Sequence, residues 1–266
     1  MTVLIAMVKK HAPWTFCALT VGLSFTTYVL PLPREALPFV IVLIPTVVAF
    51  TLAAVTEGRP GVGGLLRQLG RWRISLGWYA AVIGLGLALR LGMSLLGLAL
   101  GLIPSLQFRP LTPPEVALLA FVPLIPAFLE ELGWRGYALP RLLERYSPLA
   151  AGLALGLPWA AVHLALHLPG MLYDGLPLAA TCLQLVGLSV ILTWLYAQTR
   201  SVPLAALLHT AQTFFGVVNH GLDPVMQSWL MAAVYMAAAL ALTALAGPSF
   251  LRRATPAVIQ PIPADT

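Results

Sequence analysis

Long apolar runs fill most of this chain, and the short segments between them hold most of its charged residues. An α-helix needs about 20 predominantly apolar residues to cross the hydrocarbon core of a bilayer. Runs of about that length lie near residues 13–31, 37–56, 75–103, 115–138, 149–168, 177–199, 203–219 and 226–247. The pattern predicts an all-α fold, a polytopic membrane helix bundle of about eight transmembrane helices.

The composition supports the membrane assignment and sets the domain organisation. Of the 266 residues, 59% are hydrophobic and only 9% are charged, whereas a soluble domain carries roughly 25% charged residues. We predict a single transmembrane domain over residues 1–250, with a core at 115–220 that holds the polar motifs. The polar segment 251–266 contains prolines and is expected to be a short, disordered cytoplasmic tail.

Basic residues mark every second boundary between the apolar runs, while the loops between those boundaries are close to neutral or acidic. The basic positions are Lys9, Lys10, Arg59, Arg67, Arg71, Arg73, Arg141, Arg145, Arg200, Arg252 and Arg253. Because Lys and Arg accumulate in short cytoplasmic loops, the pattern predicts that both termini are cytoplasmic. The net charge of +6 follows from this asymmetry, so membrane lipids are expected partners and nucleic acid is not.

Few ionisable residues fall inside the predicted spans; they are Arg90, Glu130, Glu131, Arg135, His163, His167 and His209. A charge at bilayer depth costs roughly 2.5 to 3.5 kcal/mol, so these residues need a compensating role. Adjacent helical positions point about 100° apart, so Glu130 and Glu131 face different partners. Glu131 and Arg135 have the i,i+4 spacing of an ion pair, which leaves Glu130 to face a cavity. In the alternative reading, all three form a solvated ion cluster that ends the fourth span.

His163 and His209 lie on two further apolar segments. A lone histidine in a span is most often a packing residue, but His and Glu together can activate water, directly or through a metal. His167 follows His163 by four residues, which makes a two-histidine metal face geometrically available. The His-Glu-x-x-His signature is absent here, so the spacing does not identify a metalloprotease.

The expected depths of these residues in the membrane do not all agree. At 1.5 Å per residue, His209 lies about 9 Å inside a span that starts at 203, and Glu130 about 12 Å inside one that ends near 138. His163 would lie about 21 Å inside a span that starts at 149. We therefore expect the fifth helix to enter the membrane late, with a surface or re-entrant portion up to Pro158.

Three motifs follow one another on three apolar helices: Glu-Glu-x-x-x-Arg at 130–135, an aromatic-x-x-x-His at 159–163 and a His-x-x-x-polar at 209–213. In this order they resemble the CPBP family of intramembrane proteases, which includes CAAX prenyl endopeptidases and bacteriocin-related members. The first motif and the residues after it are especially similar to bacterial members. The resemblance covers about a third of the chain.

The resemblance implies a role for each matching residue. Glu130 and His163 look like the pair that activates the attacking water. Glu131 and Arg135 look like the ion pair that supports it. His209 looks like a stabiliser of the oxyanion, or a metal ligand in the metalloprotease description of the family.

Thr213 departs from the family pattern, which usually has Asn and sometimes Asp at this place. A Thr hydroxyl is shorter than an Asn amide, and the loss of one oxyanion donor costs roughly 100- to 1000-fold in rate. Gln212 and Asn219 are nearby amides that could take over. Thr213 nevertheless stays among the predicted site residues.

The resemblance implies an intramembrane endopeptidase that acts on a membrane-associated or lipidated peptide, in the bacterial cytoplasmic membrane, with its active site open to the cytoplasm. The preferred mechanism needs no cofactor. In the alternative, zinc binds Glu130, His163 and His209, with water as the fourth ligand. Two other classes stay open: a non-catalytic family member that acts as a membrane binding or regulatory protein, and a transporter that uses Glu130 and Arg90 as a relay.

Overall fold

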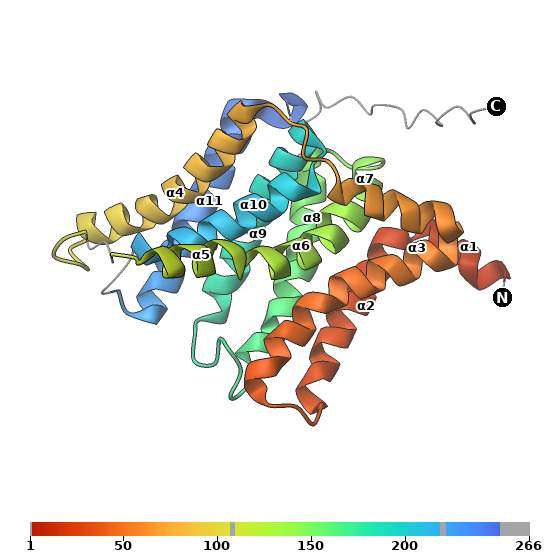
Figure 1. The fold of residues 1–266 in the computed structure, drawn as a ribbon, viewed down its shortest axis with the longest axis horizontal. Helices are drawn as coiled ribbons and strands as arrows, with labels where there is room; N and C mark the ends of the chain where they lie inside the picture. Colours follow the sequence, from red (N-terminus) through yellow and green to blue (C-terminus); the bar gives the residue numbers. More distant parts are fainter. Residues whose placement is uncertain (1, 107–109, 219–221, 251–266) are drawn as a thin grey trace.

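Helices are the regular elements of the computed structural model, which describes residues 2–106, 110–218 and 222–250 (Figure 1). The α-helices are α1 (Thr2–Lys10), α2 (Ala12–Thr26), α3 (Leu37–Leu69), α4 (Leu76–Ala99), α5 (Pro113–Phe121), α6 (Leu124–Glu131), α7 (Leu139–Leu143), α8 (Pro148–Leu164), α9 (Leu178–Thr199), α10 (Val202–Phe214) and α11 (Pro224–Phe250). A π-helical segment, η3 (Leu132–Ala138), joins α6 to α7, and short 3₁₀ turns flank several helices. No strand occurs in the described ranges, and the all-α fold is confirmed.

Not every predicted run is long enough to cross a bilayer on its own. Among the described residues, six helical stretches are long and apolar enough: α3, α4, the stretch from α5 to α7, α8, α9 and α11. The other two runs correspond to α2 with 15 residues and α10 with 13, fewer than the about 17 that a span requires. The polytopic helical fold is confirmed, while the count of eight and the cytoplasmic termini stay predictions. The tail predicted at 251–266 lies outside the described residues.

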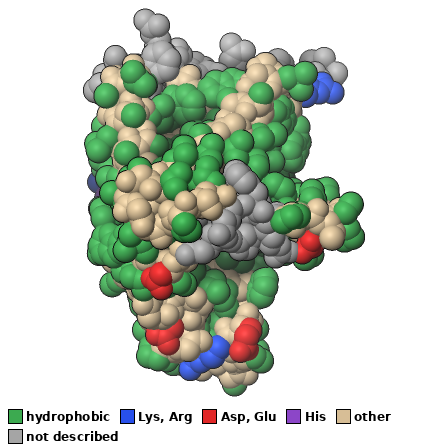
Figure 2. All heavy atoms as spheres, turned by 90° about the vertical axis from the view of Figure 1, so that its left-hand side faces the viewer, with side chains coloured by type: hydrophobic (Ala, Val, Ile, Leu, Met, Phe, Trp, Pro, Cys, Tyr) green, Lys and Arg blue, Asp and Glu red, His purple; other side chains and the backbone are tan. Residues whose placement is uncertain are grey.

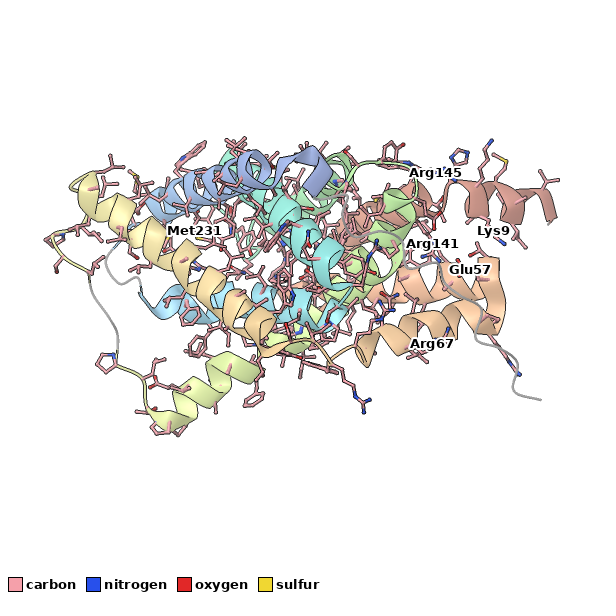
Figure 3. The ribbon with its side chains drawn as sticks, turned by 90° about the horizontal axis from the view of Figure 1, so that it is seen from above. Lys9, Glu57, Arg67, Arg141, Arg145 and Met231 are labelled. Carbon is pink, nitrogen blue, oxygen red and sulfur yellow. The ribbon has the colours of Figure 1, made fainter. Side chains whose placement is uncertain are left out.

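The outer surface is apolar over most of the face that Figure 2 shows, and most of the visible acidic and basic side chains gather toward its lower end. Large apolar side chains such as Phe39, Leu240 and Leu245 are exposed on the helices. Exposed apolar surface of this extent is unfavourable in water and is what lipid tails cover. Helix α5 has no buried residue and stands away from the bundle (Figure 3).

Helix α8 is continuous where the sequence suggested a break. It runs from Pro148 to Leu164 with Pro158 inside it, and the stretch to His167 is long and apolar enough to span a membrane. The level at which it enters the membrane stays a prediction, as does the expected surface or re-entrant portion up to Pro158. The helix does not break at Pro158. The reason is packing: Gly156 lets α9 come so close that a Cβ atom there would lie 3.0 Å from Ser189 Cβ. The tight contact supports the helix through residues that weaken it in isolation.

The segment η3 carries the end of the first motif in a wide π-helical turn. Single π-helical turns interrupt α-helices and frequently occur at functional sites. Helix α3 packs directly on η3: a Cβ atom on Gly133 of η3 would lie 2.6 Å from the carbonyl oxygen of Pro45 in α3. Gln68 of α3 also donates a hydrogen bond to the Gly136 carbonyl at 2.8 Å, and Thr46 donates one to the Leu129 carbonyl. Helix α3 thereby fixes the position of η3.

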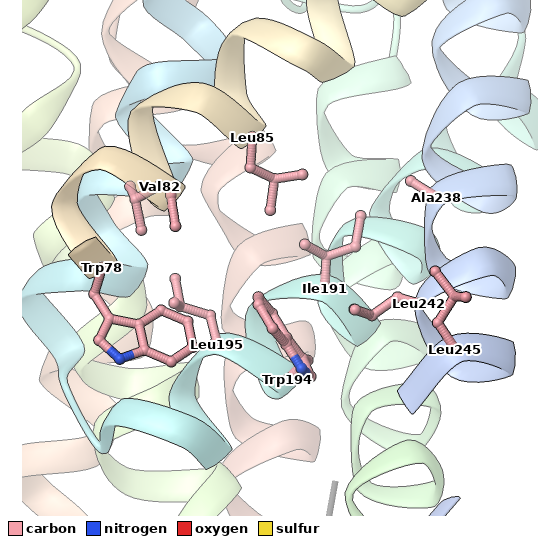
Figure 4. A pocket seen from close by; sticks show the side chains of 10 residues that line it. Trp78, Val82, Leu85, Ile191, Trp194, Leu195, Ala238, Leu242 and Leu245 are labelled. Atoms are coloured by element: carbon pink, nitrogen blue, oxygen red, sulfur yellow. The ribbon is translucent and has the colours of Figure 1, made fainter. Parts of the chain in front are cut away.

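An apolar cavity of about 290 Å³ lies between α4, α9 and α11 (Figure 4). Trp78 of α4, Trp194 of α9 and Leu245 of α11 are among the residues that line it, and the two indole rings are 5.6 Å apart. Its lining includes none of the ionisable residues that the sequence singled out inside the spans. The polar residues of the motifs gather elsewhere, around the end of α6.

Candidate active site

Glu131 is the centre of a buried charge cluster that three helical segments form. The side chains of Glu131, at the end of α6, and Arg135, in η3, are both 0% exposed, and Arg135 Nη1 lies 3.1 Å from each carboxylate oxygen. His209 of α10 adds its Nδ1 at 3.1 Å from Glu131 Oε1. The expected i,i+4 pair is present and has a third member. The alternative of a solvated ion cluster is wrong, because the pair is excluded from solvent.

Glu130 contacts a different neighbour, as adjacent positions on a helix require. It is 7% exposed, and Trp159 Nε1 of α8 donates a hydrogen bond to its Oε2 at 2.9 Å. This bond occupies one carboxylate oxygen with a rigid, fully buried donor. A carboxylate has about four acceptor positions, so the remaining ones are available to a water molecule.

The hydrogen bonds of His163 determine which of its ring nitrogens carries a proton. Its Nδ1 lies 3.0 Å from the carbonyl oxygen of Trp159, one turn earlier on α8. A carbonyl oxygen only accepts hydrogen bonds, so Nδ1 carries the proton and the neutral ring presents a lone pair at Nε2. This tautomer can accept a proton or a hydrogen bond from water.

Trp159 joins the parts of the site and was not among the predicted site residues. Its ring centroid lies 5.8 Å from that of His163 and 5.6 Å from that of His209, both edge to face. The Arg135 guanidinium carbon lies 4.5 Å from the centre of the same ring, within the range of a cation–π contact. The signal for Trp159 was present in the sequence, because it is the aromatic residue of the second motif.

Tyr173, in the loop between α8 and α9, is a second residue that sequence reasoning missed. Its ring stacks on His163 with a 6.2 Å centroid distance and a 16° interplanar angle, and it meets His167 edge to face at 5.5 Å. Burial, reinforced by the Glu130 carboxylate, raises the pKa of the phenol above its ordinary value, so Tyr173 stays neutral. His167 itself lies 3.1 Å from the Thr181 hydroxyl and is turned to that partner.

Ser189 of α9 connects the charge cluster to the neighbouring helix pair. Arg135 Nη2 donates a hydrogen bond to its hydroxyl at 3.4 Å, and the hydroxyl donates to the Gly152 carbonyl at 2.9 Å. Ser189 and Gly152 are both buried. Nothing in the sequence marks Ser189, because a serine in an apolar helix commonly satisfies itself on its own backbone.

Thr213 lies next to the cluster, but its hydroxyl is already used. The hydroxyl donates a hydrogen bond to the His209 carbonyl at 3.2 Å and accepts one from Gln212 Nε2 at 2.9 Å. The expected hydroxyl donor is therefore turned to its own helix. Asn219, the other amide considered for this role, lies outside the described residues.

The site does not form a metal centre with the residues that the structure describes. In that part of the chain, no three His, Cys, Asp or Glu side chains are grouped so that they could hold a metal ion. The zinc set of Glu130, His163 and His209 is therefore not used in the mechanism below. Metal dependence stays a prediction for a chelation experiment.

The site coincides with the part of the chain that resembles known proteins. Residues 112–215 match the family model for type II CAAX prenyl endopeptidase Rce1-like proteins. Over these residues the chain is similar to the CAAX endopeptidase family. A protein named CAAX prenyl protease 2, from Methanococcus maripaludis, is 33% identical over 100 residues, which are 34% of this chain and 36% of the relative. The chain thus matches about a third of the length of that relative. The recognition of the CPBP family from the three motifs is confirmed.

Proposed function

We propose that this protein is an intramembrane endopeptidase that hydrolyses a peptide bond of a membrane-associated substrate with water activated by Glu130 and His163. The observation that carries the proposal is that Glu130 and His163 are both hydrogen-bonded to Trp159. Trp159 donates its indole N–H to Glu130 and accepts the Nδ1 proton of His163 on its carbonyl oxygen. One residue thus fixes the position of the base and the tautomer of the histidine, which favours a role in catalysis.

In the proposed reaction, the water oxygen attacks the carbonyl carbon of the scissile bond while Glu130 accepts the water proton. His163 Nε2 accepts the second hydrogen bond of the water and orients its lone pair. When the tetrahedral intermediate collapses, the C–N bond breaks and Glu130 returns the proton to the leaving nitrogen. The products are a carboxylic acid and an amine, which become a carboxylate and an ammonium group by proton exchange with solvent, and the enzyme groups return to their starting state.

His209 supports the negative oxygen of the intermediate. Its Nδ1 proton goes to Glu131, so a second proton on Nε2 makes an imidazolium whose charge the carboxylate offsets. With that proton, the two carboxylates Glu130 and Glu131 balance the two cations Arg135 and His209. A cluster of zero net charge is the least costly arrangement in a low-dielectric interior.

The substrate class follows from where the site lies. The first two motifs lie on helical stretches that are long and apolar enough to span a membrane, Pro113–Leu143 and Pro148–His167, so a peptide must be held at the membrane to reach Glu130. We propose a membrane-associated or lipidated peptide that enters from the cytoplasmic side of a bacterial cytoplasmic membrane. The name of the relative, CAAX prenyl protease 2, supports a prenylated peptide as the first substrate to test.

A second candidate is a non-catalytic family member that binds or regulates a membrane partner. The observation that favours it is the state of Thr213, whose hydroxyl donates to the His209 carbonyl and not into the site. Under this reading the charge cluster would only stabilise the fold.

The decisive experiment measures cleavage of a fluorescence-quenched peptide, prenylated and unprenylated, by purified protein in lipid vesicles. Glu130→Gln keeps the side-chain shape and an acceptor for Trp159 but removes the base. We expect a loss of roughly 10² to 10⁴-fold in kcat, the usual contribution of general acid–base catalysis. His163→Gln is expected to lower kcat to a similar extent.

The matched control is Glu144→Gln, because Glu144 is an exposed carboxylate on the same part of the chain. Cleavage by this variant should equal that of the wild type. If the wild type, Glu130→Gln and His163→Gln cleave equally little with both peptides, the non-catalytic reading replaces the protease.

A further inference from the structure

Arg90 is a buried cation in the middle of α4 and has no acidic partner among the described residues. It is 7% exposed, and its hydrogen bonds within the described residues all go to neutral groups. Nε donates to the Gln212 carbonyl, Nη2 donates to Gln212 Oε1 at 3.2 Å, and Nη1 lies 3.1 Å from the sulfur of Met231 on α11. Two oxygens of one residue, Gln212, thus occupy one edge of the guanidinium.

These contacts fix the orientation of the Gln212 side-chain amide. Tyr235 of α11 also donates its hydroxyl hydrogen to Gln212 Oε1, at 2.9 Å. Because Arg90 and Tyr235 both donate to the same atom, that atom is the oxygen, and the NH₂ group points the other way. Gln212 and Tyr235 are buried, so water does not compete for these bonds.

The NH₂ group of Gln212 is linked to His209 through Thr213, whose hydroxyl accepts from Gln212 Nε2 and donates to the His209 carbonyl. Gln212 and Thr213 follow His209 by three and four residues, positions that lie on one helix face. Nε2 donates one hydrogen to the Thr213 hydroxyl at 2.9 Å. An amide nitrogen carries two hydrogens, so one N–H is left beyond this bond.

We propose that this remaining N–H of Gln212 donates a hydrogen bond to the oxyanion of the tetrahedral intermediate, beside His209. The inference deepens the proposed function and rests on it. In this arrangement Thr213 holds the amide nitrogen in place, and its hydroxyl is not itself a donor to the substrate. Arg90 and Tyr235 are positioning residues, because they act through Gln212.

The buried charge of Arg90 gives the amide a further property. Its guanidinium lies behind the carbonyl end of the amide and pulls electron density toward Oε1, which strengthens the N–H groups as donors. The positive charge of Arg90 also attracts the oxyanion directly as the intermediate becomes negative. An oriented, pre-polarised donor is the kind of group that stabilises a transition state without reorganising.

The experiment compares two variants that separate donation from structure. Gln212→Glu keeps the shape and the acceptor oxygens for Arg90 and Tyr235, and it converts the contact with Arg90 into an ion pair. It removes the N–H donor. We expect kcat for the prenylated peptide to fall about 100- to 1000-fold, with KM changed less than about 3-fold. Gln212→Met is neutral and also lacks the donor, so a similar fall shows that added negative charge is not the cause.

If the role of Gln212 is only structural, the two variants should differ in activity, with Gln212→Glu more active than Gln212→Met. If Gln212 only holds Arg90, Gln212→Glu should retain full activity and at least wild-type resistance to unfolding, while Gln212→Met loses both. That result would overturn the proposal. Tyr235→Phe leaves Arg90 as the only donor to Oε1 and is expected to lower kcat by about 10-fold or less, the value of one neutral hydrogen bond.

Binding of a tetrahedral mimic separates this proposal from the proposed function. The probe is the prenylated peptide with a phosphonate in place of the scissile amide, because its anionic oxygen resembles the oxyanion. Gln212→Glu should weaken phosphonate binding at least 100-fold and leave binding of the uncleaved peptide unchanged. Cleavage and phosphonate binding that stay at wild-type levels in both variants refute the role of Gln212 but not that of Glu130. If Gln212→Met loses phosphonate binding while neither the wild type nor any variant cleaves the peptide, the result supports the donor role of Gln212 and refutes the protease function.

Discussion

The buried pair of Glu131 and Arg135 predicts a large and partner-dependent loss of stability when one charge is removed. Arg135→Met keeps an unbranched apolar stem but leaves Glu131 without its guanidinium. Breaking a buried ion pair from one side costs about 3 to 5 kcal/mol, because the remaining charge stays in the low-dielectric interior. His209 supplies a second cation when it is protonated, so we expect the lower part of that range, about 3 kcal/mol.

The magnitude matters because membrane and soluble domains have little stability to lose. A typical domain unfolds with about 5 to 15 kcal/mol, so the single variant removes a fifth or more of it. Restoring charge balance should reverse much of the effect. In the double variant Glu131→Gln with Arg135→Met, the buried carboxylate becomes a neutral amide, and we expect a coupling energy of about 2 kcal/mol or more between the two substitutions.

The assay is unfolding in mixed micelles of increasing SDS content, followed by tryptophan fluorescence. The matched control is Arg141→Met, because Arg141 pairs with Glu57 where the side chains are 22% and 33% exposed. A surface pair contributes about 0 to 1 kcal/mol, so this variant should unfold almost as the wild type does. If Arg135→Met costs no more than Arg141→Met, or if the double variant is no more stable than the single one, the reasoning about the buried cluster is refuted.

Three further predictions follow from other contacts. Gly133→Ala places a methyl group 2.6 Å from the Pro45 carbonyl oxygen and should lower the unfolding free energy by about 1 to 3 kcal/mol. The control is Gly84→Ala, whose added methyl group meets no atom within 4 Å and should cost nothing in the same assay. Equal effects of the two substitutions would show that the close approach of α3 is unimportant. Thr213→Asn should raise kcat by no more than about 3-fold, since Gln212 already provides an amide donor by the oxyanion reasoning; a gain of 100-fold would show that the Thr is limiting. Treatment with a chelator, followed by its removal, should leave cleavage unchanged, whereas a loss restored by zinc would establish the metal mechanism.

Local spacing explains the parts of the site that the sequence could predict. The separation of Glu130 and Glu131 onto different partners, and the pairing of Glu131 with Arg135, both follow from positions on one helical segment. Trp159 was visible as the aromatic residue of a motif, but its contacts to Glu130, His163 and Arg135 were not. The relation between two helices depends on how each is rotated about its axis, which spacing within one helix does not determine.

The depth argument for His163 left out the same kind of information. It assumed that every helix starts at the same level, whereas α8 is a continuous helix whose position depends on its tight glycine contacts with α9. Tyr173 and Ser189 show the limit more clearly. One lies in a loop and the other in an apolar helix, and only the packing of α8 against its neighbours brings them to His163 and Arg135.

The sequence by itself determined that this is a polytopic helical membrane protein, and that most of its few intramembrane charges lie in three motifs that resemble those of a protease family. The cost of placing charge and open backbone in lipid restricts such a chain to helices and makes every intramembrane charge conspicuous. The tertiary structure alone decided which groups meet across helices: Glu131 with His209, Glu130 with Trp159, and the amide of Gln212 with Arg90. Those arrangements result from side chains meeting across helices at close approach, and only the packed bundle sets that geometry.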